Sequence, residues 1–252
     1  MKWAVHEAKA NAERHEKAQT LGKPIETLAE KFGRLAQEDR TSTAVRDRLA
    51  RREEERRRRL RVEMLLESNG VPAKYRAAAL NQTSDLPVEV VFGYHAACQD
   101  LLTLLDHPGI IVLLGMRGAG KTHMACGLVN AFCHRLKQAT YAKASDYFLR
   151  LDEAITLRES VLKVEQAYLR PDLLVLDAME ERADTVHKDR MLVRLIDKRY
   201  DATKSTLLIS NETEAQFNAR VGESVADRIQ DDGQKIECRW PSLRGRVAGR
   251  SP

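Results

Sequence analysis

Residues 110–122 read Ile110-Ile111-Val112-Leu113-Leu114-Gly115-Met116-Arg117-Gly118-Ala119-Gly120-Lys121-Thr122. The last eight of them fit the pattern G-x-x-x-x-G-K-[ST]. Glycines in this pattern let the backbone make a tight turn whose N–H groups converge on phosphate oxygens. We therefore predict a phosphate-binding loop, and it decides the fold class.

The residues on both sides have the context that this loop requires, a buried strand before it and a helix after it. The run 110–114 is apolar and partly β-branched, as is typical of a strand buried on both faces. Residues 121–137 carry apolar side chains near helical spacing. In such a loop Lys121 contacts the β- and γ-phosphates and Thr122 ligates Mg²⁺, so ATP and Mg²⁺ are the expected ligands. A glycine turn that fits the pattern by chance is the alternative.

Polar residues also follow two later strands. Asp177 ends the apolar run 173–177, 56 residues after Lys121, and its carboxylate could hold Mg²⁺, usually through water. Asn211 follows the run 206–209 and could orient the attacking water or contact the γ-phosphate. Ligands bind at the carboxyl ends of parallel strands. We favour these roles over a turn-capping Asp and a turn-forming Asn, which remain the alternatives.

Strands alternate with helices from about residue 108 onward, which predicts an α/β fold with a parallel sheet flanked by helices. The predicted strands are 110–114, 140–143, 173–177 and 206–209. The predicted helices lie near 94–105, 121–137, 152–169 and 190–200, with Ser145 as a possible N-cap.

Residues 1–68 are predicted to form an N-terminal helical domain, separate from an ATP-binding domain of residues 69–252. The stretch 68–72, Ser-Asn-Gly-Val-Pro, breaks the chain between them. An apolar stripe at helical spacing is most simply the core of a small helical bundle, and docking against a partner is the alternative. The stripe consists of Ile25, Leu28, Phe32 and Leu35.

The net charge of +5 has its origin in one stretch. Residues 46–61 hold nine arginines against four acidic residues, which equals the excess of the whole chain. Such a field favours a polyanion or an acidic protein surface. A solvated helix in which Glu53, Glu54 and Glu55 pair with arginines four residues later explains it equally well.

Other classes of protein are disfavoured by composition. No stretch approaches the roughly 18 apolar residues of a membrane span, and no secretory signal is visible at the N-terminus. We expect a cytoplasmic protein without a membrane partner. The cysteines show no C-x-x-C spacing, and we expect buried thiols rather than a metal site. They are Cys98, Cys126, Cys133 and Cys238.

Six motifs lie in chain order at residues 70–76, 118–125, 172–177, 209–211, 223–229 and 240–247. Together they resemble the bacterial helicase loaders of the DnaC type. The transposition helper ATPases of the IstB type share most of these motifs, and both families belong to the AAA+ class. The ending at 240–247 and the lead-in at 70–76 favour the DnaC type. The resemblance covers about residues 70–250.

This resemblance implies an AAA+ ATPase that forms a homo-oligomer. Asn211 would be the sensor residue, Arg228 the finger that reaches the next subunit's nucleotide, and Arg244 the second sensor. The N-terminal helices would bind the replicative DNA helicase, while the ATPase body contacts single-stranded DNA. An IstB-type protein would instead bind duplex DNA. ATP would be bound by Gly115, Gly118, Ala119, Gly120, Lys121, Thr122 and His123, and Mg²⁺ by Thr122 and Asp177.

Two features depart from the family pattern. The residue after Asp177 is usually acidic and orients water, but here it is Ala178, and Glu180 or Glu181 would have to substitute. We therefore predict slow hydrolysis, with ATP acting as a conformational switch. Only about a dozen residues follow Trp240, so we expect a minimal or absent helical lid.

Nucleic-acid binding is expected from three basic groups, whose phosphate contacts should weaken as salt rises. A third functional hypothesis is a scaffold that binds nucleic acid without nucleotide. The basic groups are residues 46–61, then Arg150, Arg158 and Lys163, and finally Arg239, Arg244, Arg246 and Arg250.

Overall fold

A computed structural model of the chain describes residues 28–84, 86–181 and 186–244. The chain divides into two compact units, residues 1–57 and 58–252. The second unit contains a five-stranded parallel sheet with strand order β2-β3-β4-β1-β5. This arrangement confirms the predicted fold class. The strands are β1 (Ile110–Leu114), β2 (Ala139–Lys143), β3 (Leu173–Asp177), β4 (Ser205–Ile209) and β5 (Gly233–Glu237).

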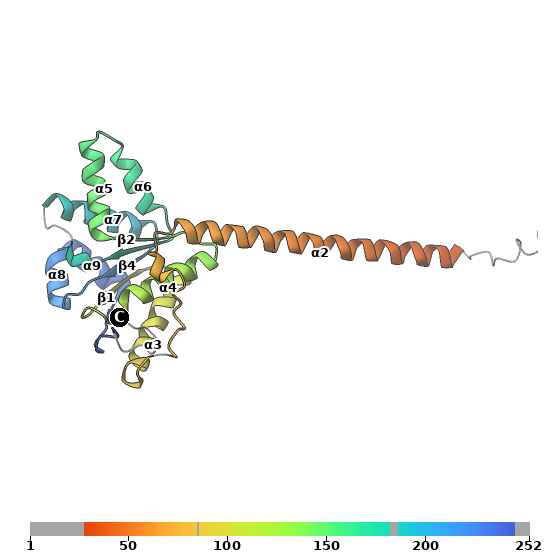
Figure 1. The fold of residues 1–252 in the computed structure, drawn as a ribbon. Helices are drawn as coiled ribbons and strands as arrows, with labels where there is room; N and C mark the ends of the chain where they lie inside the picture. Colours follow the sequence, from red (N-terminus) through yellow and green to blue (C-terminus); the bar gives the residue numbers. More distant parts are fainter. Residues whose placement is uncertain (1–27, 85, 182–185, 245–252) are drawn as a thin grey trace, which may run out of the picture. The chain divides into compact units, whose positions relative to one another are not determined.

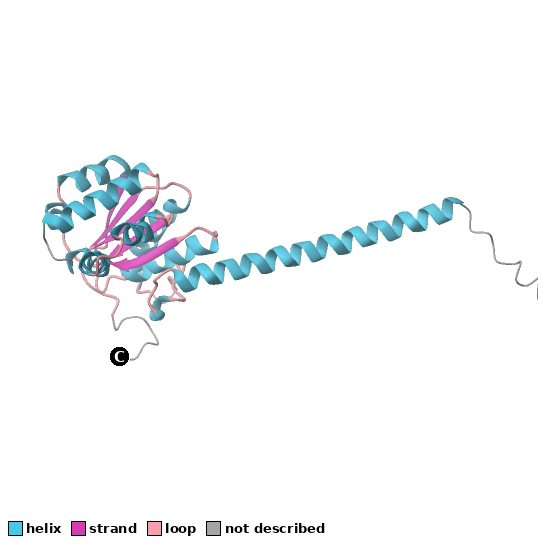
Figure 2. Cartoon of the chain, turned by 90° about the horizontal axis from the view of Figure 1, so that it is seen from above, coloured by secondary structure: helices cyan, strands magenta, loops and turns pink. Residues whose placement is uncertain are grey.

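Helices cover both faces of this sheet, as Figures 1 and 2 show. The α-helices are α2 (Leu28–Ser68), α3 (Val88–Leu102), α4 (Lys121–His134), α5 (Ala144–Thr156), α6 (Val161–Leu169), α7 (Val186–Asp201), α8 (Glu214–Val221) and α9 (Glu223–Asp232). The short 3₁₀ helices are η1 (Ala73–Tyr75), η2 (Thr103–Leu105) and η3 (Met179–Glu181).

The sheet separates two apolar cores. Successive side chains of a strand point to opposite faces, so Ile111 and Leu113 of β1 pack with α3 and α4, whereas Ile110, Val112 and Leu114 pack with α5, α7, α8 and α9. All five residues of β1, β3 and β4 are buried. Burial on both faces explains why these strands are continuous apolar runs.

Two local predictions were wrong. The charged stretch 152–169 is not one helix, because α5 ends at Thr156 and α6 begins at Val161. Arg158 lies between them with a left-handed φ of 54°, which no α-helix accommodates. Ser145 is not an N-cap, since α5 begins at Ala144 after Lys143.

The described part of the first unit, residues 28–57, belongs to helix α2. Phe32 is 66% exposed, so this side chain of the predicted stripe is not in a core, and Ile25 lies outside the described residues. Every residue from 43 to 61 is exposed, and Glu53 pairs with Arg57 at 3.3 Å as the spacing predicts. The domain division at residues 68 and 69 stays a prediction.

The end of α2 is joined to strand β2 in the second unit. Leu65 is buried in the core that includes α4, and the carbonyl of buried Asn69 accepts a hydrogen bond from the Tyr141 N–H at 2.7 Å. Gly70 has a φ of 76°, and a Cβ at this position would lie 2.3 Å from the Tyr141 carbonyl oxygen. At the predicted break, the backbone thus passes so close to β2 that position 70 needs glycine.

We predict that Gly70→Ala lowers the free energy of unfolding by about 2–4 kcal/mol, from a left-handed backbone cost plus a forced shift against β2. Chemical denaturation of the purified chain measures this change. Ser68→Ala is the control, because its exposed hydroxyl bonds only carbonyls of its own helix, and it should change stability by less than about 0.5 kcal/mol. Equal effects of the two variants would contradict the close approach.

Candidate functional site: a phosphate-binding loop and two strand ends

The loop at 115–122 joins the end of β1 to the start of α4, as predicted. Gly118 and Gly120 have φ values of 89° and 86°. A Cβ at Gly118 would lie 2.1 Å from the Ser242 Oγ, and one at Gly120 would lie 2.9 Å from the Tyr94 ring. Both positions therefore need glycine for backbone conformation and for space. Helix α4 begins at Lys121, so its N-terminal N–H groups face the loop, as an anion site requires.

The Lys121 ammonium donates hydrogen bonds to three acceptors, two in the loop and one at the end of β4. Its Nζ donates to the Gly115 carbonyl at 2.6 Å, to the Met116 carbonyl at 3.1 Å and to the Asn211 Oδ1 at 2.9 Å. Burial lowers the pKa of this lysine from its ordinary value. The ammonium group is thus partly desolvated and close to the loop backbone, where it is suited to bind a phosphate.

Thr122 and Asp177 meet between α4 and β3. The Thr122 hydroxyl donates to the Asp177 Oδ2 at 2.7 Å, and the Ala178 N–H donates to Oδ1 at 2.7 Å. A hydroxyl and a carboxylate side by side are the hard oxygen ligands that Mg²⁺ prefers. The residues present therefore fit Mg²⁺, which would neutralise phosphate charge when bound.

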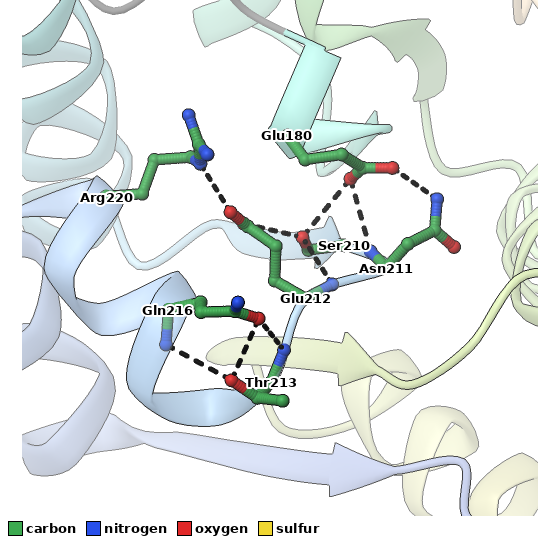
Figure 3. Close-up of polar contacts among 7 residues, drawn as sticks. All are labelled: Glu180, Ser210, Asn211, Glu212, Thr213, Gln216 and Arg220. Atoms are coloured by element: carbon green, nitrogen blue, oxygen red, sulfur yellow. Dashed lines mark hydrogen bonds and ion pairs between the residues drawn. The ribbon is translucent and has the colours of Figure 1, made fainter.

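Asn211 and Glu180 form a second polar pair at the end of β4, shown in Figure 3. The Asn211 backbone N–H donates to the Glu180 Oε2 at 3.2 Å, and the Asn211 side-chain amide donates to Oε1. The Ser210 hydroxyl lies 3.2 Å from Oε2 and shares its single proton between Glu180 and Glu212. Because the Asn211 Oδ1 accepts from Lys121, one amide side chain connects the lysine of the loop with the carboxylate of Glu180.

Neighbouring contacts fix this strand end. Glu212 accepts from the Ser210 hydroxyl at 2.9 Å and pairs with Arg220 of α8 at 2.6 Å (Figure 3). Helix α8 begins with a capping box between Thr213 and Gln216. The chain that carries Asn211 is therefore tied to a defined helix start two residues later.

Glu180 and Glu181 point to different partners. Burial acts to raise the pKa of Glu180, but hydrogen bonds from its own backbone, Asn211 and Ser210 outweigh it and hold this pKa below its ordinary value. Glu180 is thus a carboxylate at neutral pH. Glu181 lies 3.8 Å from Arg117 of the loop, and its side chain is 46% exposed.

The segment after β5 crosses the predicted phosphate-binding loop. The Trp240 indole N–H donates to the Ala119 carbonyl at 2.9 Å, and the Leu243 N–H donates to the Gly118 carbonyl at 2.9 Å. A Cβ at Gly118 would lie 3.4 Å from the Arg244 Cγ, which places Arg244 beside the loop. No helix follows β5 among the described residues, which end at Arg244.

Comparison with known proteins now assigns a family. Residues 16–250 match the sequence profile of the IstB-like ATP binding proteins. The chain belongs to this family. The assignment confirms the AAA+ resemblance stated above, which named both the IstB and the DnaC types.

Two curated relatives have similar sequences. A Mycobacterium tuberculosis protein, named as an ATP-binding protein in an insertion sequence, is 31% identical over 158 residues, which cover 60% of this chain and 62% of the relative. The chain thus spans less than two thirds of that relative's length. YdaV, an uncharacterised Escherichia coli protein, is 23% identical over 191 residues, with 75% and 77% of the two chains covered.

Several solved structures share the fold of this IstB-like chain. The DnaC helicase loader has a TM-score of 0.57 at 18% identity, covering 66% of this chain and 99% of DnaC. DnaI has a TM-score of 0.54 at 17% identity, covering 68% and 93%. AMPPCP-bound DnaA from Aquifex aeolicus has a TM-score of 0.55 at 20% identity, covering 66% and 51%.

Two further predicted site residues of this IstB-like protein, His123 and Arg228, lie on helices α4 and α9. The His123 Nδ1 is 2.9 Å from the Tyr94 hydroxyl, on the first turn of α4. Arg228 lies on α9, and its Nε is 2.5 Å from the Asp197 Oδ1 of α7, within the same chain. Arg228 is thus paired within its own chain, with Asp197 of α7 and with the Ser224 carbonyl of α9.

Sequence reasoning missed two contacts at the site. Tyr141 of β2 donates its hydroxyl to the Asp177 Oδ2 at 2.7 Å. The Trp240 indole donates to the loop backbone, a contact that neither the motif at 240–247 nor the short C-terminal stretch predicts. Both contacts join residues at least 36 positions apart in the sequence, so no local sequence pattern predicts them.

All four cysteines are buried thiols, and the residues that the structure describes contain no cluster of His, Cys, Asp or Glu suited to a metal. Across the same residues, none of the helices has the length and apolar character to cross a membrane.

Proposed function

We propose that this chain is an ATP-dependent loader of a replicative DNA helicase, similar to DnaC, in which ATP and Mg²⁺ control assembly on single-stranded DNA. The observation that carries the ATP-dependent part is the convergence of Lys121, Thr122, Asp177 and Asn211 at the carboxyl ends of β1, β3 and β4. The helicase partner is supported by the sequence resemblance at 70–76 and 240–247, the second of which includes the segment across the loop.

In this proposal the loop glycines and Lys121 bind the phosphates, and Thr122 and Asp177 hold Mg²⁺. A γ-phosphate would compete with the Gly115 and Met116 carbonyls for the Lys121 ammonium. Asn211 would turn part of its hydrogen bonding toward that phosphate, and this change would reach Glu180 directly, because the two side chains are bonded. Glu180 would then accept the proton of the attacking water.

Slow hydrolysis remains part of the proposal. Ala178 has no carboxylate, and its left-handed φ of 56° leads the chain into η3, which brings Glu180 to the end of β4. A base that is already engaged by three donors must exchange those bonds for water before it acts. Because hydrolysis would be slow, ATP would stay bound for a long time and would act as a conformational switch.

The proposed oligomer needs Arg228 at a neighbour's nucleotide, and this requires release of its ion pair with Asp197. The N-terminal helices would bind the helicase. Solved DnaA is described bound to single-stranded DNA and AMPPCP, and we extend such an arrangement to this chain as a hypothesis.

A transposition helper that binds duplex DNA is the second candidate function. It is favoured by the family profile and by the mycobacterial relative from an insertion sequence. It uses the same nucleotide site with a different partner.

Size analysis tests the proposal. The purified chain is measured with and without a non-hydrolysable ATP analogue and Mg²⁺, and then with a replicative helicase and single-stranded DNA, or with a transposase and duplex DNA. A nucleotide-dependent complex with helicase supports the loader. A complex with transposase alone supports the second candidate, and no response to nucleotide refutes both.

Single-stranded DNA affinity should fall steeply with salt, because exposed basic side chains would contact phosphates. Joint replacement of Arg150, Arg158 and Lys163 by alanine should reduce the slope of log affinity against log salt by about 2, or roughly 0.7 for each lost contact. Fluorescence anisotropy measures the slope. Arg135→Ala is the control, since Arg135 pairs with Asp106 at 2.5 Å. An unchanged slope in the triple variant would show that these three side chains do not contact DNA phosphates.

A further inference from the structure

Asp177 shares one carboxylate oxygen between two hydroxyl donors. Its Oδ2 accepts from Thr122 at 2.7 Å and from Tyr141 at 2.7 Å. Tyr141 and Asp177 are 7% and 8% exposed, so both groups are shielded from bulk water. The Thr122 contact belongs to the expected metal site, but the phenol does not, and it needs its own explanation.

The phenol restricts which lone pairs of Asp177 stay available. An ionised carboxylate offers about four lone pairs. Thr122 and Tyr141 use those of Oδ2, and the Ala178 N–H uses one on Oδ1. About one lone pair of Oδ1 would remain for Mg²⁺ or for a water that Mg²⁺ binds. Without the phenol, the carboxylate could rotate and present Oδ2 in other directions.

Tyr141 is itself held firmly. On β2 it lies opposite Val175 of β3, two residues before Asp177. Its N–H donates to the carbonyl of Asn69, and its own carbonyl faces Gly70. The side chain therefore extends toward Asp177 from a backbone fixed by the neighbouring strand and by the segment that ends α2. A fixed donor can orient a carboxylate, whereas a mobile one would follow it.

We propose that Tyr141 is a positioning residue that orients the Asp177 carboxylate for Mg²⁺. This inference rests on the proposed function, since it deepens the role of the same site. It predicts a specific defect, in which Mg²⁺ binding weakens while the contacts of the loop with phosphate remain.

Tyr141→Phe tests the inference, because it keeps the ring and removes only the hydroxyl. Binding of a fluorescent, non-hydrolysable ATP analogue is followed as Mg²⁺ is added. The Mg²⁺ concentration that gives half of the metal-dependent gain in affinity should rise by about 10-fold or more. Affinity for the analogue in EDTA should stay within about 2-fold of the wild-type chain. Tyr147→Phe is the matched control, since this buried tyrosine lies in the core on the other face of the sheet.

The outcomes separate this inference from the proposed function. A wild-type chain whose analogue binding ignores Mg²⁺ defeats the proposed function itself. A wild-type chain that responds to Mg²⁺, together with a Tyr141→Phe variant that responds identically, defeats only the role of Tyr141. An equal loss of affinity with and without Mg²⁺ also overturns it, because that result indicates general damage to the fold.

A second measurement avoids dependence on the folding of that variant. 3-Fluorotyrosine is incorporated at position 141 of the full chain, and its ¹⁹F resonance is recorded. The resonance should shift when Mg²⁺ is added to the analogue complex, and 3-fluorotyrosine at position 147 should not respond. A resonance at position 141 that ignores Mg²⁺ would overturn the inference.

Discussion

Lys121→Ala should lower the affinity for ATP by about 100-fold. The Nζ of Lys121 lies between the Gly115 carbonyl and the Asn211 amide, at the mouth of the loop. Removing one partner of a buried, hydrogen-bonded charge pair costs about 2–5 kcal/mol, and about 2.7 kcal/mol corresponds to 100-fold in affinity. Isothermal titration with a non-hydrolysable ATP analogue and Mg²⁺ measures the change.

Lys235→Ala is the matched control for this variant. Lys235 lies on β5, beside β1, and pairs with Glu214 at 2.8 Å, away from the loop. It should bind the analogue as the wild-type chain does. Assembly and DNA binding are then measured for Lys121→Ala. If both persist without nucleotide, the chain is a nucleotide-independent scaffold, and the proposed switch is refuted.

The sequence predicts the centre of this site because its residues lie at the ends of apolar strands or shortly after them. Lys121, Asp177 and Asn211 each come within seven residues of a buried run, and parallel strands bring such ends to one edge of the sheet. The roles assigned to these residues stay predictions. The structure adds the contacts between them, above all the amide of Asn211 between Lys121 and Glu180.

What the sequence did not predict depends on contacts between distant residues. Strand β5 has only one buried residue, Ile236, and it forms a strand because it pairs with β1 at the edge of the sheet. Tyr141 reaches Asp177 only through the pairing of β2 with β3. The Trp240 indole meets a carbonyl 121 residues earlier. No periodicity or spacing reports such pairings, since they arise from tertiary packing.

Glu180→Gln should lower the rate of ATP hydrolysis by about 100-fold or more while ATP affinity stays within a few-fold. Removal of a positioned general base costs 10²- to 10⁴-fold in rate, as an order of magnitude. Glutamine keeps the shape and an acceptor for Asn211, but it cannot take a proton from water. Single-turnover hydrolysis and analogue binding measure the two quantities separately. Because ATP would persist, the nucleotide-dependent oligomer of this variant should live longer than that of the wild-type chain.

Glu181→Gln distinguishes the two glutamates that could replace the missing acid at position 178. Glu181 contacts Arg117 at 3.8 Å and is half exposed, whereas Glu180 is bonded to the strand end that carries Asn211. Glu181→Gln should therefore hydrolyse ATP within about 3-fold of the wild-type rate, since exposed ion pairs contribute little. If Glu181→Gln is the slower variant, then Glu181, beside Arg117 of the loop, is the general base. If neither variant slows hydrolysis, no carboxylate of η3 acts as the base, and the contact between Glu180 and Asn211 serves only to hold the end of β4.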